Sequence, residues 1–223
     1  MKRILLFGLV LALTRLAAIA QENKTAPGAG NVLYENNFEK AELDKVPAEF
    51  LVLDGGFAVK QEGANKFLEL PGAPLETFGM LFGPTRETDV AVSAKMRGTA
   101  KGRRFPTYAI GLNGVGGYRL QVSPAKNALE LYKGDGVVAA VPFEEKIGSW
   151  MILRLENRKV GENDYKLEGK VWRENMVEPK EPTITFAEKT KPAAGRASIW
   201  GSPYAGTPIQ FDDLKVVGSP VNK

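Results

Sequence analysis

Residues 106–143 decide the fold, and they read PTYAIGLNGVGGYRLQVSPAKNALELYKGDGVVAAVPF. This stretch predicts four consecutive short strands, at about residues 106–112, 117–123, 127–133 and 136–142. The breaks between them contain Asn-Gly, Gly-Gly, Pro-Ala-Lys-Asn and Gly-Asp-Gly, and Gly, Asn and Asp tolerate the positive φ of tight hairpin turns. We therefore expect an antiparallel meander, covered on one side by strands from the rest of the chain.

Alternation of apolar and polar residues assigns the two faces of this meander, since successive side chains of a strand point to opposite sides. Tyr118, Leu120 and Val122 share the face expected to be buried. The outward positions of the second and third strands are Arg119, Gln121, Ser123, Glu130 and Tyr132.

The rest of the chain also reads as short strands, and no helical periodicity is sustained over more than two turns. Further strands are expected at about 32–38, 49–53, 57–61, 66–70, 80–82, 88–97, 149–157, 164–174, 183–186, 196–200 and 208–217. Many short strands separated by glycine-rich turns predict an all-β, two-sheet antiparallel sandwich.

The N-terminus predicts a secretory signal peptide over residues 1–20. Met1-Lys2-Arg3 is basic, Ile4 to Leu13 is apolar, and Ala18-Ile19-Ala20 is a small-x-small cleavage site. The alternative is a membrane anchor, but a span needs about 20 continuous apolar residues. After cleavage we expect a flexible lead-in at 21–31, one β-sandwich domain at 32–217, a tail at 218–223, and no membrane span.

Charge and missing residue types exclude several classes of function. Removing residues 1–20 takes three of the 30 basic residues and none of the 26 acidic ones, which leaves a net charge of +1 and no basic stripe for nucleic acid. The chain has no cysteine and no histidine, so thiol nucleophiles, Ser-His-Asp triads and the usual zinc sites are unavailable. Any metal would be an oxygen-preferring one such as calcium.

Six segments in order resemble the concanavalin A-like jelly-roll superfamily, in its bacterial secreted branch with laminin-G-like and 3-keto-disaccharide-hydrolase-like domains. They are LYENNFE, FLVLDGGFAVKQEGANKFLEL, DVAVSAKMR, GYRLQVSPAKNALELYKGDG, GSWMILRLENRKVGENDYKLEGKVW and GRASIWGSPYAGTPIQFDDLKV. The resemblance covers residues 32–217 and rests on strand order and spacing. It implies two stacked sheets, a concave face that often binds sugars, a structural calcium where the first and last strands meet, and a secreted or periplasmic location.

The expected calcium site lies in the last strand, at the point where its apolar residues change from one face to the other. Apolar residues switch faces in the middle of 208–217, which predicts a β-bulge at Asp212-Asp213. With Asn37 and Glu39 at the corner after the first strand, these acids supply the oxygen ligands that calcium prefers. The alternative is a pair of solvated turn acids.

Glycosidase chemistry of the usual kind is not expected. Retaining glycosidases of this superfamily carry a Glu-x-Asp-x-x-Glu strand motif, which sets two carboxyls about 5 Å apart, and the chain has no such spacing. A keto-sugar chemistry would need only a base, Glu130 or Tyr132, and an electrostatic stabiliser, Arg119. The alternative is an ordinary cross-strand ion pair with a packing tyrosine.

Aromatic residues on polar faces are the candidates for glycan binding, because the C–H groups of a sugar stack on a ring. Trp172 shares its face with charged residues, so it is either a binding platform or covered by the Pro-containing segment 175–195. Trp200 and Tyr204 form a second candidate pair, expected in a loop near a strand end.

Together these observations favour a secreted, non-catalytic domain that binds a glycan or polysaccharide, or is otherwise associated with the envelope. Two alternatives stay open: an enzyme of the 3-keto-disaccharide-hydrolase-like kind, and a structural or adhesion module that binds protein. A buried carboxyl with a raised pKa in the binding groove would favour the enzyme.

Overall fold

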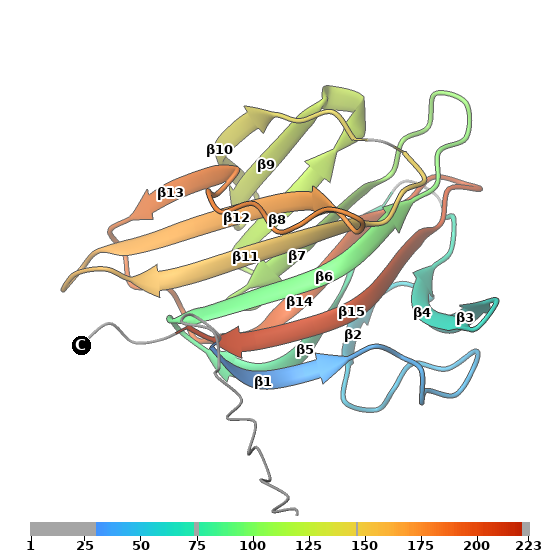
Figure 1. Ribbon diagram of the computed structural model, residues 1–223, viewed down its shortest axis with the longest axis horizontal. Coiled ribbons are helices and arrows are strands. Elements are labelled where there is room, and N and C mark those ends of the chain that lie inside the picture. Colours follow the sequence, from blue (N-terminus) through green and yellow to red (C-terminus); the bar gives the residue numbers. More distant parts are fainter. Residues whose placement is uncertain (1–29, 74–75, 146, 220–223) are drawn as a thin grey trace, which may run out of the picture.

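Two antiparallel sheets stack face to face in the computed structural model, which describes residues 30–73, 76–145 and 147–219 (Figure 1). The predicted signal peptide, nearly all of the lead-in and residues 220–223 lie outside this part of the chain. Its strands are β1 (Asn31–Asn36), β2 (Leu51–Asp54), β3 (Ala58–Glu62), β4 (Asn65–Leu70), β5 (Phe78–Arg86), β6 (Val90–Gly98), β7 (Thr107–Leu112), β8 (Tyr118–Ser123), β9 (Ala128–Lys133), β10 (Gly136–Pro142), β11 (Met151–Lys159), β12 (Tyr165–Arg173), β13 (Ile184–Glu188), β14 (Gly195–Ser202) and β15 (Ile209–Gly218).

The strand order defines two sheets that we call sheet A and sheet B. Sheet A, in front in Figure 1, has the order β13-β12-β11-β6-β15-β4-β3, and β1 pairs with β15 next to β4. Sheet B, behind it, has the order β10-β9-β8-β7-β14-β5-β2. The prediction of an all-β antiparallel sandwich is therefore confirmed.

The predicted meander forms one half of sheet B. Strands β7 to β10 are consecutive neighbours, and their bounds differ from the expected ones by at most a residue. Arg119 lies opposite Tyr132, and Gln121 lies opposite Glu130, so the outward residues of β8 and β9 share one face as predicted.

The core lies between the sheets and is built from the inward positions of both. Because each fully buried aliphatic or aromatic side chain stabilises the fold by about 1.5–3 kcal/mol, this layer carries most of the stability. Members with 0–1% of their surface exposed include Tyr108, Ile110, Leu120 and Leu131 from sheet B, and Val92, Leu153, Leu167 and Phe211 from sheet A.

The predicted bulge at Asp212-Asp213 is present. The pairing of β15 with β6 shifts register between Asp212 and Lys215, and Asp213 has a φ of 47°. The shift returns Leu214 and Val216 to the core, where both are at most 1% exposed.

One strand is much longer than predicted. β5 was expected as residues 80–82, but it extends over Phe78–Arg86. The prediction was too short because residues 78–82 are buried on both faces, and such a strand lacks the alternation that marks one exposed face. Among the described residues, no helix has the length and apolar character that crossing a bilayer requires.

Candidate functional site

Three of the predicted binding residues meet on the outer face of sheet B. Arg119 projects from β8, Tyr132 from the neighbouring β9, and Trp200 from β14 on the far side of β7. The guanidinium carbon of Arg119 lies 5.3 Å from the ring centroid of Tyr132 and 5.1 Å from that of Trp200. The cation is therefore attracted to two aromatic rings at once.

Small residues on the neighbouring strands make room for this arrangement. A Cβ atom at Gly79 of β5 would lie 2.4 Å from Trp200 Cε3, so the indole ring lies directly over the glycine. Ala109 of β7 is 1% exposed, and Ser198 accepts a hydrogen bond of 2.8 Å from the indole Nε1. These contacts fix the orientation of the Trp200 ring.

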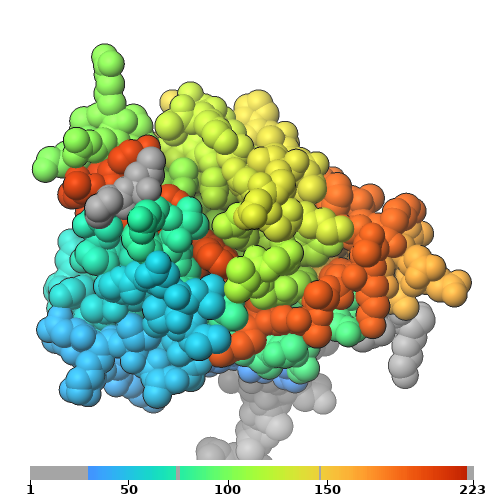
Figure 2. Space-filling view, turned by 180° about the vertical axis from the view of Figure 1, so that it is seen from behind, coloured from blue at the N-terminus to red at the C-terminus, as the bar shows by residue number. Residues whose placement is uncertain are grey.

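The surface of this face is uneven. In Figure 2, which looks onto sheet B, an orange-red patch of β14 is visible at the floor between the blue-to-cyan side and the yellow-green side of the molecule. At the β2 edge, Leu51 lies opposite Leu81 of β5 and exposes 51% of its surface. The face thus combines an apolar rim with a polar, aromatic floor.

Glu130 lies on the same face, but its carboxylate already accepts hydrogen bonds from three neighbouring side chains. It is 5% exposed and accepts hydrogen bonds from Ser123 (2.5 Å), Lys126 (2.9 Å) and Tyr132 (3.2 Å). Burial acts to raise the pKa of this carboxyl, but the bonds from Ser123 and Lys126 outweigh burial and hold the pKa below its ordinary value. Glu130 is therefore an ionised anchor for its neighbours, which is a poor state for a general acid at neutral pH.

Trp200 differs from its predicted placement. It was expected at the boundary between a strand at 196–200 and a loop, but it lies within β14, whose pairing continues through Gly201 to Ser202. Gly201 is a packing residue here, since a Cβ atom would lie 2.7 Å from Ile209 and 2.8 Å from Leu70 in the core. A glycine inside a strand often marks such a close approach, and the sequence alone does not separate this role from a turn.

The remaining two predicted binding residues lie elsewhere. Tyr204 follows β14 in the turn to β15, where its backbone N–H donates to Thr207 Oγ1 (2.7 Å). Trp172 lies on β12 opposite Ile152, half-buried on the outer face of sheet A. The predicted set thus forms one cluster of four residues on sheet B, while Tyr204 lies in the turn after β14 and Trp172 lies on the opposite side of the sandwich.

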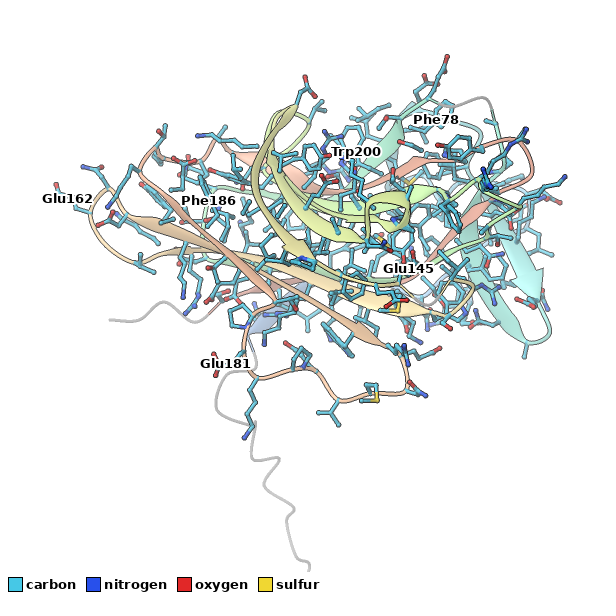
Figure 3. All side chains as sticks on the ribbon, turned by 90° about the horizontal axis from the view of Figure 1, so that it is seen from above. Phe78, Glu145, Glu162, Glu181, Phe186 and Trp200 are labelled. Atoms are coloured by element: carbon cyan, nitrogen blue, oxygen red, sulfur yellow. The ribbon has the colours of Figure 1, made fainter. Side chains whose placement is uncertain are left out.

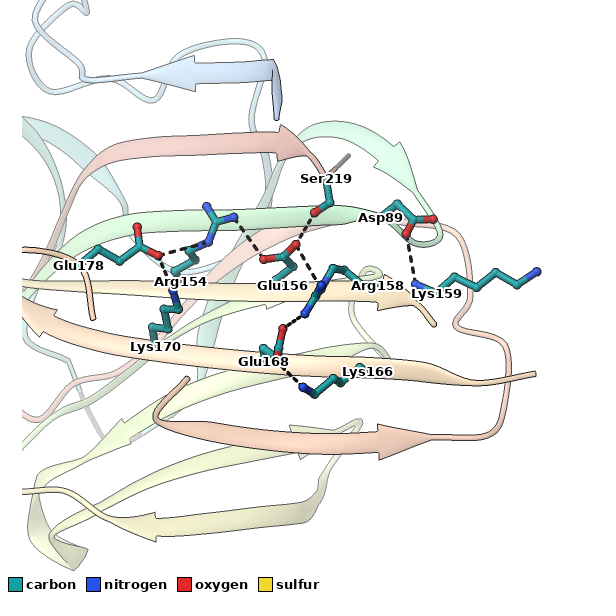
Figure 4. A network of polar contacts seen from close by, with 10 residues as sticks. All are labelled: Asp89, Arg154, Glu156, Arg158, Lys159, Lys166, Glu168, Lys170, Glu178 and Ser219. Atoms are coloured by element: carbon teal, nitrogen blue, oxygen red, sulfur yellow. Dashed lines mark hydrogen bonds and ion pairs between the residues drawn. The ribbon is translucent and has the colours of Figure 1, made fainter. Parts of the chain in front are cut away.

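The charged residues beside Trp172 bind one another (Figure 4). Glu168 pairs with Arg158 and with Lys166 (2.7 Å), and Lys170 pairs with Glu178 (2.9 Å). Glu178 belongs to the predicted covering segment 175–195, so this segment contacts the face at that point. Partly exposed pairs of this kind contribute about 0–1 kcal/mol each.

The predicted calcium ligands at the bulge are occupied by other partners. Asp212 is 4% exposed, and its carboxyl accepts hydrogen bonds from Asn65 (3.2 Å) and from the Asp213 N–H (2.7 Å). Burial raises the pKa of Asp212 to about 6. Asp213 pairs with the ammonium group of Lys95 (2.8 Å), a cation that opposes a second cation beside it.

The other two expected ligands also make local contacts. Asn37 Oδ1 accepts from the Glu39 N–H (3.4 Å), and Glu39 Oε1 accepts from the Lys66 N–H (3.1 Å). Within the described ranges, no group of three or more Asp, Glu, His or Cys side chains is placed to hold a metal ion. These residues do not fit a calcium site, and calcium binding is not confirmed.

A buried carboxyl with a raised pKa exists, but away from the outer face of sheet B. Glu145 precedes β11, and its Oε1 accepts a hydrogen bond of 2.5 Å from the hydroxyl of the inward-facing Tyr108. Burial raises the pKa of Glu145 to about 7. Figure 3 shows Glu145 below Trp200, between the two layers, so this carboxyl contacts the inward-facing Tyr108 and does not belong to the Arg119 cluster.

Comparisons with known proteins identify the architecture. No family model and no curated protein sequence matches the chain. Among solved structures, the carbohydrate-binding module CBM66 from Bacillus subtilis has a TM-score of 0.53 at 13% identity, covering 76% of this chain and 95% of that one. The metal-free carbohydrate recognition domain of Emp46p reaches 0.59 at 13% identity, covering 85% and 97%.

A third similar structure is the exoplasmic/lumenal domain of VIP36 in its Ca2+/Man2-bound form, with a TM-score of 0.57 at 8% identity, covering 81% of this chain and 87% of that one. At such low identities the likeness concerns the fold alone. The fold is a concanavalin A-like jelly roll, as the resemblance implied.

Proposed function

We propose that this protein is a secreted, non-catalytic carbohydrate-binding domain and that its glycan contacts the outer face of sheet B around Arg119. The observation that carries the proposal is the guanidinium of Arg119, held between the rings of Tyr132 and Trp200. A sugar needs N–H or O–H partners for its hydroxyls and ring or aliphatic surface for its C–H groups. Arg119 supplies the donors, and the ring of Tyr132 supplies the apolar surface.

Preorganisation supports this site. Arg119 also donates to the Gly134 carbonyl oxygen (3.2 Å), and Trp200 is fixed by Ser198, so neither side chain has to be ordered by the ligand. Ordering a long side chain on binding costs about 0.5–1.5 kcal/mol, and this site avoids that cost. The similar solved structures include a carbohydrate-binding module, a carbohydrate recognition domain and a domain in a Ca2+/Man2-bound form, which agrees with the proposal.

The non-catalytic part of the proposal rests on the state of the carboxyls. Glu130 has a lowered pKa and three hydrogen-bond donors around it. The carboxyls with raised pKa values lie elsewhere: Glu145 faces Tyr108, and Asp212 is at the β15 bulge in sheet A. None of these carboxyls matches a general acid poised beside a sugar bound at Arg119. Incubating glycan hits with the protein and analysing the products by mass spectrometry tests this: any turnover contradicts it.

The binding test uses a glycan array with residues 21–223, with and without calcium. Arg119→Ala and Trp200→Ala should each weaken binding on this face at least about tenfold, because the first removes a charged hydrogen-bond donor and the second removes the ring that holds the Arg119 guanidinium in place. Trp172→Ala is the matched control, because it removes a half-buried tryptophan from the opposite sheet.

Each outcome of that test has a defined meaning. Loss of binding only in Trp172→Ala would move the site to sheet A. Absence of binding to every glycan would overturn the proposal and favour a protein-binding module. Secretion is tested separately by N-terminal sequencing of the exported protein, which should begin at Gln21.

A further inference from the structure

A cavity of about 880 Å³ opens on the outer face of sheet A, on the other side of the sandwich from Arg119. Its floor comes from β15, β6 and β11, and its wall comes from the end of β1 and the loop that follows. In Figure 1, sheet A is in front, and this loop leaves β1 at the lower right of the sheet. The volume lies within the range of roughly 300–1,000 Å³ that small-molecule sites occupy.

The charges that line this cavity balance. Lys40, Lys95 and Lys215 supply three ammonium groups, and Glu35, Glu49 and Asp213 supply three carboxylates. Lys95 pairs with Asp213 at 2.8 Å, and Lys215 lies 3.8 Å from Glu35. An ion of either sign would therefore meet as much repulsion as attraction, and the cavity favours a ligand without net charge.

The polar atoms suit hydroxyl groups. A carboxylate only accepts hydrogen bonds and an ammonium group only donates them, whereas a hydroxyl does both. A ligand with hydroxyls on adjacent carbons can therefore bridge pairs such as Glu35 and Lys215, and bonds to charged groups are about twice as strong as neutral ones. The side chain of Ser93 adds a further hydroxyl to the floor.

The wall is held in place before any ligand arrives. The Asn36 side chain donates to Glu49 Oε1 (2.8 Å) and accepts from the Phe38 N–H (2.8 Å), which ties the end of β1 to the far end of the loop. Ile152 and Pro47 line the cavity with aliphatic surface that fits the C–H groups of a saccharide. Preformed polar partners with a small apolar surface are typical of ligand pockets.

We propose that this cavity is a second binding site, for a neutral saccharide unit, and that the domain is therefore bivalent. The site is on the sheet opposite to Arg119 and shares no residue with that cluster, so either site can fail without the other. Two sites that engage one polysaccharide raise its overall affinity by mass action, without new contacts.

The first test is a ¹⁵N–¹H NMR titration of residues 21–223 with cellohexaose, mannohexaose and a fructose hexasaccharide. At least one should shift the amide signals of Ser93, Lys95 and Lys215. Glycerol controls for solvent effects, and inorganic phosphate and free arginine represent charged ligands. Absence of shifts with every saccharide overturns the proposal, as do larger shifts with phosphate or arginine.

Variants then assign the binding to the cavity. Ser93→Trp fills the floor, and Glu35→Gln removes one acceptor charge without adding bulk, so the proposal stays testable if the larger change perturbs folding. Glu35→Gln should raise the dissociation constant of the active saccharide at this site roughly tenfold, because it removes one charged hydrogen bond. Ser93→Trp should raise it at least as much, because the indole occupies the space of the saccharide. Lys60→Gln, in an exposed Lys–Asp pair with Asp44 outside the cavity, is the control.

Trp200→Ala separates the two sites. It should leave the shifts at Ser93 and Lys215 unchanged even if it abolishes binding on sheet B. Loss of those shifts in Trp200→Ala, or affinities unchanged in both cavity variants, would contradict a separate second site.

Discussion

Glu145→Gln tests how much the buried Glu145 carboxyl makes the stability of the fold depend on pH. Glu145 Oε1 accepts a hydrogen bond of 2.5 Å from Tyr108, and Oε2 is buried without a hydrogen-bond partner in the described part of the chain. Burial raises the pKa of this carboxyl from 4.5 to about 7, although the bond from Tyr108 acts in the opposite direction. Because one pKa unit corresponds to about 1.4 kcal/mol, the shift makes about 3 kcal/mol of folding free energy depend on pH.

The sign follows from proton binding. The folded state holds the Glu145 proton more tightly than the unfolded state, so between pH 4.5 and about 7 the folded protein carries more protons at this group. The free energy of unfolding therefore falls as pH rises through this window and is level above it. Glutamine keeps the carbonyl acceptor for Tyr108 and cannot ionise. We expect Glu145→Gln to match the wild type near about pH 4 and to be more stable by up to about 3 kcal/mol near about pH 8.

Urea denaturation followed by tryptophan fluorescence, repeated across this pH range, measures the difference between the two proteins. Asp212, whose pKa burial raises to about 6, adds a slope of its own, but it is present in both proteins and cancels in the difference. Glu144→Gln is the control, because this neighbouring carboxyl is exposed, and it should change the stability little at any pH. A difference between Glu145→Gln and wild type that is constant with pH, or that grows toward low pH, would refute the reasoning.

Three further changes test other contacts. Burial opposes the ionised form of Glu188, but its hydrogen bonds, above all the one from Lys133 (2.6 Å), hold the pKa of this carboxyl at about 2. Glu188→Gln should therefore lower the free energy of unfolding by up to about 3 kcal/mol at neutral pH. Denaturation should show this loss shrinking as pH falls from 4.5 toward 2. Gly79→Ala should displace the Trp200 ring at a cost of about 1–3 kcal/mol, and an unchanged tryptophan emission spectrum would count against it. Asn113→Ala removes an amide whose two N–H groups are shared among three backbone carbonyl oxygens, so thermal denaturation should show a loss of about 2 kcal/mol or more.

The meander was predictable because its information is local. Strands β7 to β10 follow one another, each has one buried and one partly polar face, and the turns between them use residues that tolerate positive φ, such as Asn113 at 67° and Gly134 at 57°. The same rule missed most of β5, because Gly79 and Leu81 are covered on the outer face as well. A strand buried on both faces loses the period-2 signal.

The candidate site was predictable only in part, for a related reason. Arg119 and Tyr132 belong to adjacent hairpin strands, so alternation places them on one face. The approach of Trp200 to Arg119 depends on the pairing of β14 with β7, between segments far apart in the sequence, and no local pattern specifies that pairing. The role of Gly79 beneath the indole ring had no sequence signal, since a glycine in a strand is also compatible with a bulge.

The position of the last two strands has a consequence for folding kinetics. β14 lies between β7 and β5 in sheet B, and β15 lies between β6 and the pair β4 and β1 in sheet A, so both sheets receive a central strand from residues 195–218. Without these residues each sheet is divided in two, into β7–β10 and β2 with β5 in sheet B and into β6 with β11–β13 and β3 with β4 in sheet A, and β1 has no partner strand. The open edges of such groups are prone to pair with other chains. We therefore expect the long-range pairing of β14 and β15 to limit the rate of folding, and the local hairpins to form before it.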